Sequence, residues 1–252
     1  MTLAPIPFDL AAFWHFLTRW GEIQLLLPLA LLAQVFLWRQ RPSDVGSGKA
    51  SVLRRWVWGL GLAIALTAAS KLAFFGWGLG VSAWNFTGIS GHAMASAAIL
   101  PGLAWVAARG QPLSTQRLLV GLAFGLAALI AYSRLKVGAH SPSESLSGFL
   151  LGGFVSAWSL RGALATAGRG ASLPMWVPVG LLVALMVLPV GAPPSRTHDK
   201  VIQLALKLSG RHKPFERADL QRALPHRPAQ FSAASSSHSR TCSRPAPTVA
   251  AS

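Results

Sequence analysis

The chain has 252 residues, of which 52% are hydrophobic and 12% are charged, and its mean hydropathy is +0.46. A soluble domain carries about 25% charged residues, so this composition indicates a membrane protein. The 23 Lys and Arg outnumber the 7 Asp and Glu, but long apolar runs separate these bases, which argues against a protein that binds nucleic acid. The single cysteine, Cys242, excludes an intramolecular disulfide, a Cys-based zinc site and a CxxC redox centre.

Six apolar segments have the composition of membrane helices. Ahead of them, residues 8–20 alternate apolar and polar groups at helical spacing, which predicts a helix that lies in the membrane interface. The spans are expected at residues 20–38, 56–75, 92–108, 117–132, 146–160 and 173–190. The predicted fold class is therefore all-α, a polytopic membrane helix bundle with about six transmembrane helices.

The composition divides the chain into four regions. We expect an interfacial N-terminal segment at 1–19, a six-helix membrane domain at 20–192, a basic segment at 193–224 and a disordered tail at 225–252. The basic segment contains one short amphipathic pattern that predicts a helix. Its apolar positions are Val201, Leu204, Ala205 and Leu208.

The positions of Lys and Arg predict the orientation, since short cytoplasmic loops carry the excess of these residues. Five, two and two bases fall in the loops 38–56, 109–117 and 161–172, nine in all, against three on the opposite side. We therefore expect these loops in the cytoplasm of a bacterium and the stretches 77–91 and 133–145 outside its plasma (inner) membrane. Six spans place the basic C-terminal segment outside as well, against the charge rule.

Two pairs of glycines have the GxxxG spacing that lets helices approach closely in lipid. Gly121 and Gly125 lie in the fourth expected span, and Gly148 and Gly152 lie in the fifth. Both pairs predict close backbone contacts, and together they predict that the fourth and fifth spans are neighbours.

Ionisable groups are scarce in the body of the chain. Between the first loop and the C-terminal segment there is one carboxylate, Glu144, and there are two histidines, His92 and His140. An ionisable group within a membrane domain indicates a functional site, because its removal from water is costly. In the expected topology all three lie on the outer side together with Lys71 and Arg134, so a site is predicted there.

The sequence HSPSE, residues 140–144, opens the fifth span. Ser141 is a good N-cap, Pro142 suits the first helical position, and Glu144 three residues after the cap completes a capping box. Two interpretations of this glutamate stay open. It either closes the box alone, or it also holds one ring nitrogen of His140 and leaves the other nitrogen unprotonated and nucleophilic.

The tripeptide Ser90-Gly91-His92 precedes the third span. Ser90 can cap that helix, and Gly91 with the free N–H groups of the first turn offers an anion site. As a simple cap the tripeptide would carry no function. A second histidine and two cations at the same depth favour phosphate chemistry, in which one histidine attacks and the other protonates the departing oxygen.

These residues resemble the signatures of a known family. Ser133 and Arg134, then five residues, His140, then three residues and Glu144 resemble the third signature of the type 2 phosphatidic acid phosphatase (PAP2) superfamily. That family more often has Asp at the last of these positions. The resemblance points to its membrane lipid phosphatase branch.

The other two signatures are matched in part. Ser90-Gly91-His92 is similar to the second signature, with Ile89 in place of the usual preceding proline, and Lys71 would be the lysine of the first. The resemblance covers about residues 56–160. In the family this lysine is followed, after six residues, by Arg-Pro, and here no Arg or Pro occurs before Ser90. One phosphate-binding cation is therefore missing, and Lys136 is a candidate substitute.

The resemblance implies a metal-independent lipid phosphatase that needs no cofactor. His140 would attack phosphorus and form a phosphohistidine, Glu144 would orient it, and His92 would protonate the leaving alkoxide and then activate water. The residues that would hold the phosphoryl oxygens are Lys71, Ser90, Gly91 and Arg134. The substrate would be a lipid phosphate or pyrophosphate in the bilayer, of the undecaprenyl pyrophosphate, phosphatidylglycerol phosphate or phosphatidate class.

Two alternatives stay open. Two histidines and a carboxylate can also form a facial metal site, which would make the protein a metal-dependent membrane hydrolase. The missing Arg-Pro supports instead a non-catalytic PAP2-like membrane protein that binds a lipid phosphate without turnover.

Overall fold

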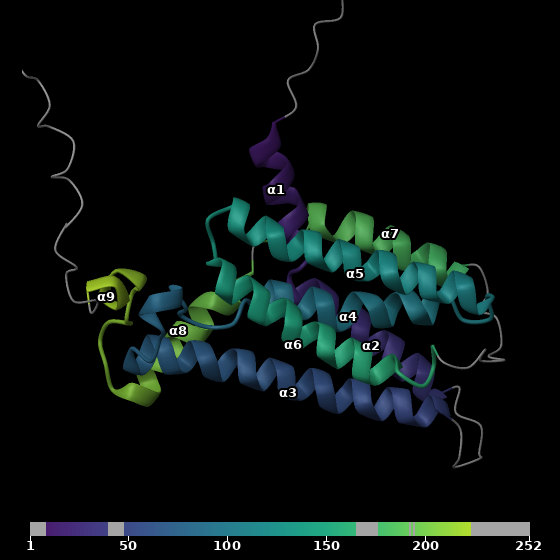
Figure 1. Ribbon diagram of the computed structural model, residues 1–252, viewed down its shortest axis with the longest axis horizontal. Coiled ribbons are helices and arrows are strands. Elements are labelled where there is room, and N and C mark those ends of the chain that lie inside the picture. The colour runs from purple at the N-terminus through teal and green to yellow at the C-terminus, as the bar shows by residue number, and fades with distance from the viewer. Residues whose placement is uncertain (1–8, 40–47, 165–175, 192, 194, 223–252) are drawn as a thin grey trace, which may run out of the picture.

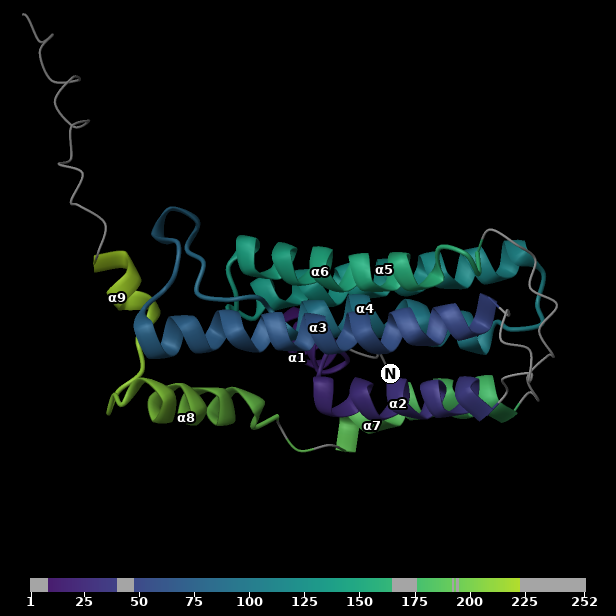
Figure 2. The ribbon, with the colours of Figure 1, turned by 90° about the horizontal axis from the view of Figure 1, so that it is seen from below.

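Apolar runs fold into helices because backbone N–H and C=O groups must be satisfied within the chain where no water reaches them. The computed structural model describes residues 9–39, 48–164, 176–191, 193 and 195–222, and these contain helices and no β-strand. Figures 1 and 2 show the long helices running alongside one another. The helices of the described residues are α1 (Leu10–Arg19), α2 (Ile23–Arg39), α3 (Gly48–Trp77), α4 (Gly91–Ala107), α5 (Leu113–Lys136), α6 (Pro142–Leu160), α7 (Trp176–Gly191), α8 (Thr197–Ser209) and α9 (Arg217–Arg222), with a short 3₁₀ turn at Ser82–Trp84.

The all-α prediction is confirmed, and each expected span falls on one of the helices α2 to α7. By length and composition, three stretches could cross a membrane: Leu10–Arg39, Val52–Trp77 and Leu113–Lys136. Gly91–Ala107 and Pro178–Gly191 are shorter apolar helices. Six crossings remain a prediction. The expected disordered tail at 225–252 lies outside the described residues.

Helix α4 lies at the centre of the bundle, where α2, α3, α5 and α6 pack around it. Pro101 lies inside this helix and has no N–H to donate to the carbonyl oxygen of Ala97. The hydroxyl of Ser156 on α6 donates to that oxygen at 2.7 Å, so a neighbouring helix satisfies the group that the proline leaves free. The central helix is thereby tied to α6 by a buried polar contact.

The glycines of α6 face α4 at very short range. A Cβ added at Gly148 would lie 2.5 Å from the carbonyl oxygen of Ser90, and one at Gly152 would collide with the carbonyl oxygen of Met94. The close approach predicted for this pair is confirmed, although its partner is α4. Helices α5 and α6 are also neighbours, as predicted. The prediction for Gly121 and Gly125 is wrong, because no atom of the described residues lies within 4 Å of a Cβ at either position.

Helix α1 runs across the direction of the long helices (Figure 1). Asp9 caps it, since its side chain accepts hydrogen bonds from the N–H groups of Ala11 and Ala12 at 2.9 and 3.1 Å. Trp14 packs edge-on against Tyr132 of α5, with ring centroids 5.6 Å apart. This crossing direction suits a helix in the interface, and its position at a membrane stays a prediction.

The predicted amphipathic helix is present as α8, which packs beside the C-terminal half of α3 (Figure 2). Its apolar residues differ in burial. Ala205 is fully buried, with its carbonyl oxygen 3.4 Å from the place of a Cβ at Gly76, whereas Leu204 and Leu208 are exposed. The apolar positions of this helix are therefore divided between the bundle and the surface.

Candidate active site

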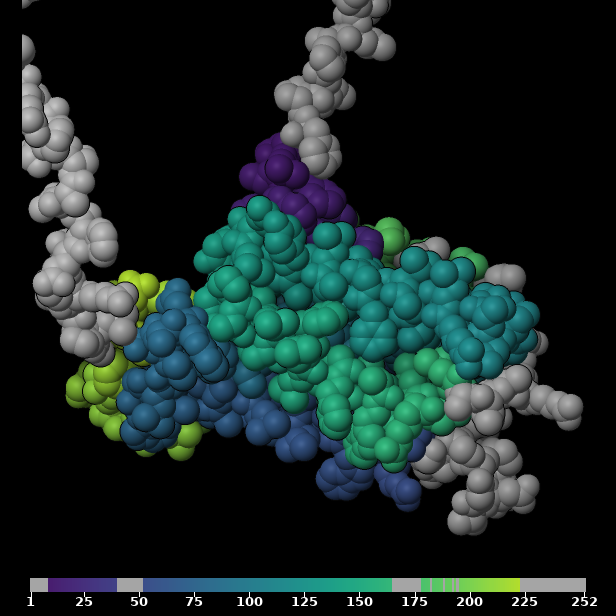
Figure 3. Space-filling model, in the orientation of Figure 1, coloured from purple at the N-terminus to yellow at the C-terminus, as the bar shows by residue number. Residues whose placement is uncertain are grey.

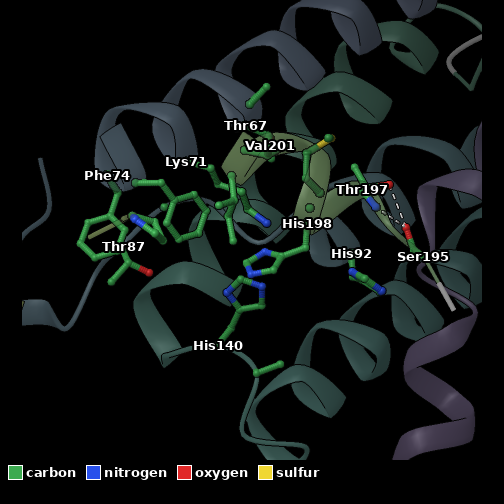
Figure 4. A pocket seen from close by; sticks show the side chains of 18 of the residues that line it. Thr67, Lys71, Phe74, Thr87, His92, His140, Ser195, Thr197, His198 and Val201 are labelled. Carbon is green, nitrogen blue, oxygen red and sulfur yellow. Dashed lines mark hydrogen bonds between the residues drawn. The ribbon is translucent and has the colours of Figure 1, made fainter. Parts of the chain in front are cut away.

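The helices α3, α4 and α5, the loops that precede α4 and α6, and the C-terminal segment (residues 195–222) line a cavity of about 630 Å³. Figure 4 shows His92, His140 and His198 directed into it, together with Lys71. Among the candidate residues, Lys71, Gly91, His92, Arg134 and His140 line the cavity. The structure thus brings together groups that the expected topology placed in one layer.

His140 and Glu144 form the central pair. Nδ1 of His140 lies 2.8 Å from Oε2 of Glu144, whose side chain is fully buried. The capping box is present as well, because Ser141 accepts a hydrogen bond from the Glu144 N–H and its own N–H donates to Oε2 at 3.1 Å. The two interpretations of Glu144 are therefore both met in geometry, and one carboxylate serves the helix start and the histidine. A proton on Nδ1 leaves Nε2 of His140 with a free lone pair.

Thr87, in the loop before α4, holds the other oxygen of this carboxylate. Its N–H and its hydroxyl both donate to Oε1 of Glu144, at 2.7 and 2.6 Å. Sequence reasoning missed Thr87, because a threonine in a loop carries no signal until its partner is known. A buried carboxylate needs such donors, since burial of an unpaired charge is costly.

Burial and the neighbouring cations keep His140 neutral. Burial, the largest cause, lowers the pKa of His140 below its ordinary value of 6.5, and Lys71 and Arg134 lower it further. The hydrogen bond and the charge of Glu144 oppose these effects without outweighing them. The imidazole is therefore uncharged at neutral pH, as a nucleophile must be.

The cations approach from two helices. Nη1 of Arg134 on α5 donates a hydrogen bond to the hydroxyl of Thr18 at 2.6 Å, and this contact holds the guanidinium group in place. Lys71 of α3 passes Gly88, whose φ of 147° and missing side chain leave room for it: a Cβ there would lie 3.0 Å from Cγ of Lys71. Within the described residues, no hydrogen bond or ion pair occupies the Lys71 ammonium group, which stays available to an anion.

Of the tripeptide Ser90-Gly91-His92 at the start of α4, only two residues lie where the sequence predicted them. Gly91 and His92 line the cavity, whereas Ser90 is fully buried and does not. Ser90 occupies the N-cap position without a side-chain capping bond, and its hydroxyl has no partner among the described residues. Its N–H donates to the backbone oxygen of Glu144 at 3.0 Å, so it joins the start of α4 to the start of α6.

At the position where the family has the Arg of Arg-Pro, this chain has a glycine, and a residue of the C-terminal segment packs against it. The seventh residue after Lys71 is Gly78, with a φ of 71°, and the ring of Phe215 lies 3.0 Å from the place of its Cβ. Arg217, two residues after Phe215, lines the cavity. Lys136, the candidate substitute, does not line the cavity: its ammonium group lies 5.2 Å from the centroid of the Tyr132 ring.

Helix α8 contributes a third histidine that sequence reasoning also missed. His198 lines the cavity (Figure 4), and its ring meets that of Phe75 edge-on at 5.4 Å. Burial lowers the pKa of His198 below 6.5, with Lys71 acting in the same direction. A basic segment after the membrane domain gave no reason to place a residue at the site.

The side chains that the structure describes at this cavity are not arranged to bind a metal ion. Across the described part of the chain, no three His, Cys, Asp or Glu side chains are grouped so that they could hold one. Both oxygens of Glu144 are already engaged by the hydrogen-bond donors of Thr87 and Arg217 and by His140. The facial arrangement that the metal-dependent alternative requires is not met in this geometry.

The chain is similar in sequence to a known family and to a bacterial relative. The model of the PAP2 superfamily matches residues 67–166, which include all the predicted site residues. The chain is 34% identical over 212 residues to the "Uncharacterized 22.5 kDa protein in cps region" of Klebsiella pneumoniae, covering 83% of this chain and 98% of the relative. No solved structure matches. With a family model that matches residues 67–166 and a relative that is similar over nearly its whole length, the chain belongs to the PAP2 superfamily.

Proposed function

We propose that the protein is a metal-independent phosphatase of lipid phosphates or lipid pyrophosphates that acts through a phosphohistidine. The observation that carries the proposal is the 2.8 Å contact of His140 Nδ1 with a fully buried Glu144, beside two cations and a second histidine. Phosphoryl transfer requires mainly positioning and positive charge around the equatorial oxygens, and this cavity offers both.

In the proposed reaction the Nε2 lone pair of His140 attacks phosphorus, and the bond from phosphorus to the lipid oxygen breaks. His92 donates a proton to that departing oxygen. Water then attacks the phosphohistidine, His92 accepts the proton of this water, and the P–N bond breaks to release inorganic phosphate. Glu144 holds the proton on Nδ1 of His140 and stabilises the charge that the ring carries in the intermediate.

The cavity walls support a lipid substrate. Beside the polar groups, the cavity has an apolar wall from α3 and α8 that includes Ile64, Phe74, Phe75, Val201 and Ile202. Such a wall suits the hydrocarbon next to a phosphoryl group. The candidate substrates are undecaprenyl pyrophosphate, phosphatidylglycerol phosphate and phosphatidate, reached from the outer side of a bacterial inner membrane.

The test is release of inorganic phosphate from these three lipids by purified protein in detergent, with and without EDTA. We expect turnover of at least one lipid that survives chelation. Loss of activity with EDTA, restored by a divalent metal, would favour the metal-dependent alternative. Binding of the lipids without any release would favour the non-catalytic protein, which the missing Arg-Pro supports.

A further inference from the structure

The C-terminal segment reaches the site although it lies beyond the residues that the family model matches. Its last helix, α9, begins at Arg217. Figure 3 shows α9 at the same end of the molecule as the loop that joins α3 and α4. This arrangement puts a guanidinium group beside the catalytic pair from a part of the sequence that the three signatures do not include.

We infer that Arg217 is the positioning residue of the His140–Glu144 pair, so that the active site of this protein is completed by its C-terminal segment. Nη2 of Arg217 lies 2.9 Å from Oε1 and 2.8 Å from Oε2 of Glu144. Nη1 donates to the backbone oxygen of Asn85 at 2.9 Å. The guanidinium group therefore spans from the carboxylate to the loop that carries Thr87.

The approach of Arg217 is fixed by the chain before and after it. The N–H of Phe215 donates to the backbone oxygen of Phe75 at 3.0 Å, and its ring rests on Gly78. Leu220 is buried, with Cδ1 3.1 Å from the place of a Cβ at Gly80. The α9 helix is thus attached to the end of α3 on both sides of Arg217, and the side chain does not depend on a surface ion pair for its position.

The positive charge of Arg217 affects the protonation of His140 through Glu144. Glu144 is fully buried and is the one carboxylate between Asp44 and Asp199, so its negative charge acts on the adjacent imidazole. Arg217 neutralises that charge across a contact shorter than 3 Å. Without the guanidinium group, Glu144 would stabilise the imidazolium form of His140 more strongly and hold its ring less firmly. A larger fraction of the nucleophile would then be protonated.

Other charged and titratable groups also face His140, and they remain in place when Arg217 is changed. They are Lys71 on α3, His92 on α4, Arg134 on α5, Glu144 on α6, His198 on α8 and Glu216, which precedes α9. A shift in the titration of His140 on replacement of Arg217 therefore reports the lost guanidinium group.

The experiment compares R217Q, R217K and R222Q in the full-length protein in detergent. Arg222 is the matched control, because it lies on the same short helix, is 77% exposed and pairs with Asp219 at 3.0 Å away from the site. The titration of His140 is followed by NMR of labelled histidine, with the signal assigned by its absence from H140A. Phosphate release is measured in parallel.

We expect the titration midpoint of His140 to rise by about 1 pH unit in R217Q, the low end of the effect of a charge that lies close by without direct contact. R222Q should titrate like the unchanged protein. R217K, which keeps the charge but cannot span Glu144 and Asn85 together, should show a smaller rise. A His140 midpoint in R217Q equal to that in R222Q would overturn the inference, and if R217Q does not fold, an unshifted R217K overturns it in the same way.

The contribution of Arg217 to turnover rests on the proposed function, whereas the titration needs no substrate. In an active protein, kcat of R217Q should fall about 10-fold to 100-fold, as when an outer partner of a functional histidine is removed. Full kcat in R217Q would contradict the role in catalysis. If the unchanged protein released no phosphate from any lipid, the proposed function would fail, while the His140 titration would still decide whether Arg217 positions the pair.

Discussion

Thr87 gives both its N–H and its hydroxyl to one oxygen of Glu144, at 2.7 and 2.6 Å. The other oxygen receives the N–H of Ser141 and faces His140. Both oxygens of the carboxylate thus accept hydrogen bonds, which fix the position of its charge before a substrate binds. Because the carboxylate is preorganised, substitutions of Glu144 or His140 should have large effects on activity.

Glu144→Gln should lower kcat by at least about 100-fold, because a neutral amide cannot stabilise the charge on His140 and its NH₂ group must face donors of Thr87 or Arg217. Glu144→Asp keeps the charge and should retain part of the activity. Ser141→Ala is the control for the capping box: it removes the cap at a cost of about 1 kcal/mol in stability and should leave kcat nearly unchanged. Full activity in Glu144→Gln with a lowered unfolding temperature would reduce Glu144 to a cap.

The two histidines that we propose as catalytic should differ in the activity that remains after each is replaced. His140→Ala should abolish turnover and any acid-labile phosphate on the protein, which is detected after quenching during turnover. His92→Ala should retain the covalent step in part, with a rate lowered about 100-fold to 10,000-fold. Normal turnover in either variant, at equal folded concentration, would refute the assignment.

The pH dependence follows from the lowered pKa of His140, for which burial is the main cause. The protonated form is inactive as a nucleophile, so activity should be lost as pH falls, with the midpoint below pH 6.5. In kcat/KM this limb reports the free enzyme. Glu144→Gln removes a group that raises the pKa of His140, so the residual activity of this variant should persist to lower pH. A limb above pH 7 in the unchanged protein would contradict the neutral His140.

Packing of α6 on α4 can be tested with a pair of glycines. Gly152→Ala should destabilise the protein by about 1 to 3 kcal/mol, since its Cβ would collide with the backbone of α4. Gly125→Ala, also inside a helix but with open space around it, should be neutral or stabilising by up to about 1 kcal/mol. Thermal unfolding in one detergent compares the two. Equal effects would mean that the α4–α6 contact does not depend on Gly152.

The orientation predicted from the bases is tested by cysteine labelling after Cys242→Ser. Ala83→Cys lies in the exposed loop at the site end, and Gln111→Cys lies in the exposed turn between α4 and α5. An impermeant reagent applied to intact cells should label the first and spare the second, because the turn at 109–117 is expected in the cytoplasm. The reverse pattern would invert the topology and place the site in the cytoplasm.

Local signals in the sequence predicted much of this fold and part of the site. The capping box at Ser141 follows from residues three apart, and the helices follow from apolar runs of sufficient length. The contact of Glu144 with Arg217 joins residues 73 positions apart, and no periodicity links them. The two GxxxG pairs are alike in sequence, and only the neighbours in space distinguish Gly152 from Gly125.

The place of Arg217 also bears on how the protein is made. Chains are synthesised from the N-terminus, so Glu144 is in the membrane domain before Arg217 has left the ribosome. The basic segment then has to reach the end of the bundle where the site lies, although its charge opposes its passage across a membrane. In the orientation predicted here, maturation of the active centre is therefore coupled to translocation of α8 and α9, and a chain halted after α7 would be inserted yet lack its last charge partner.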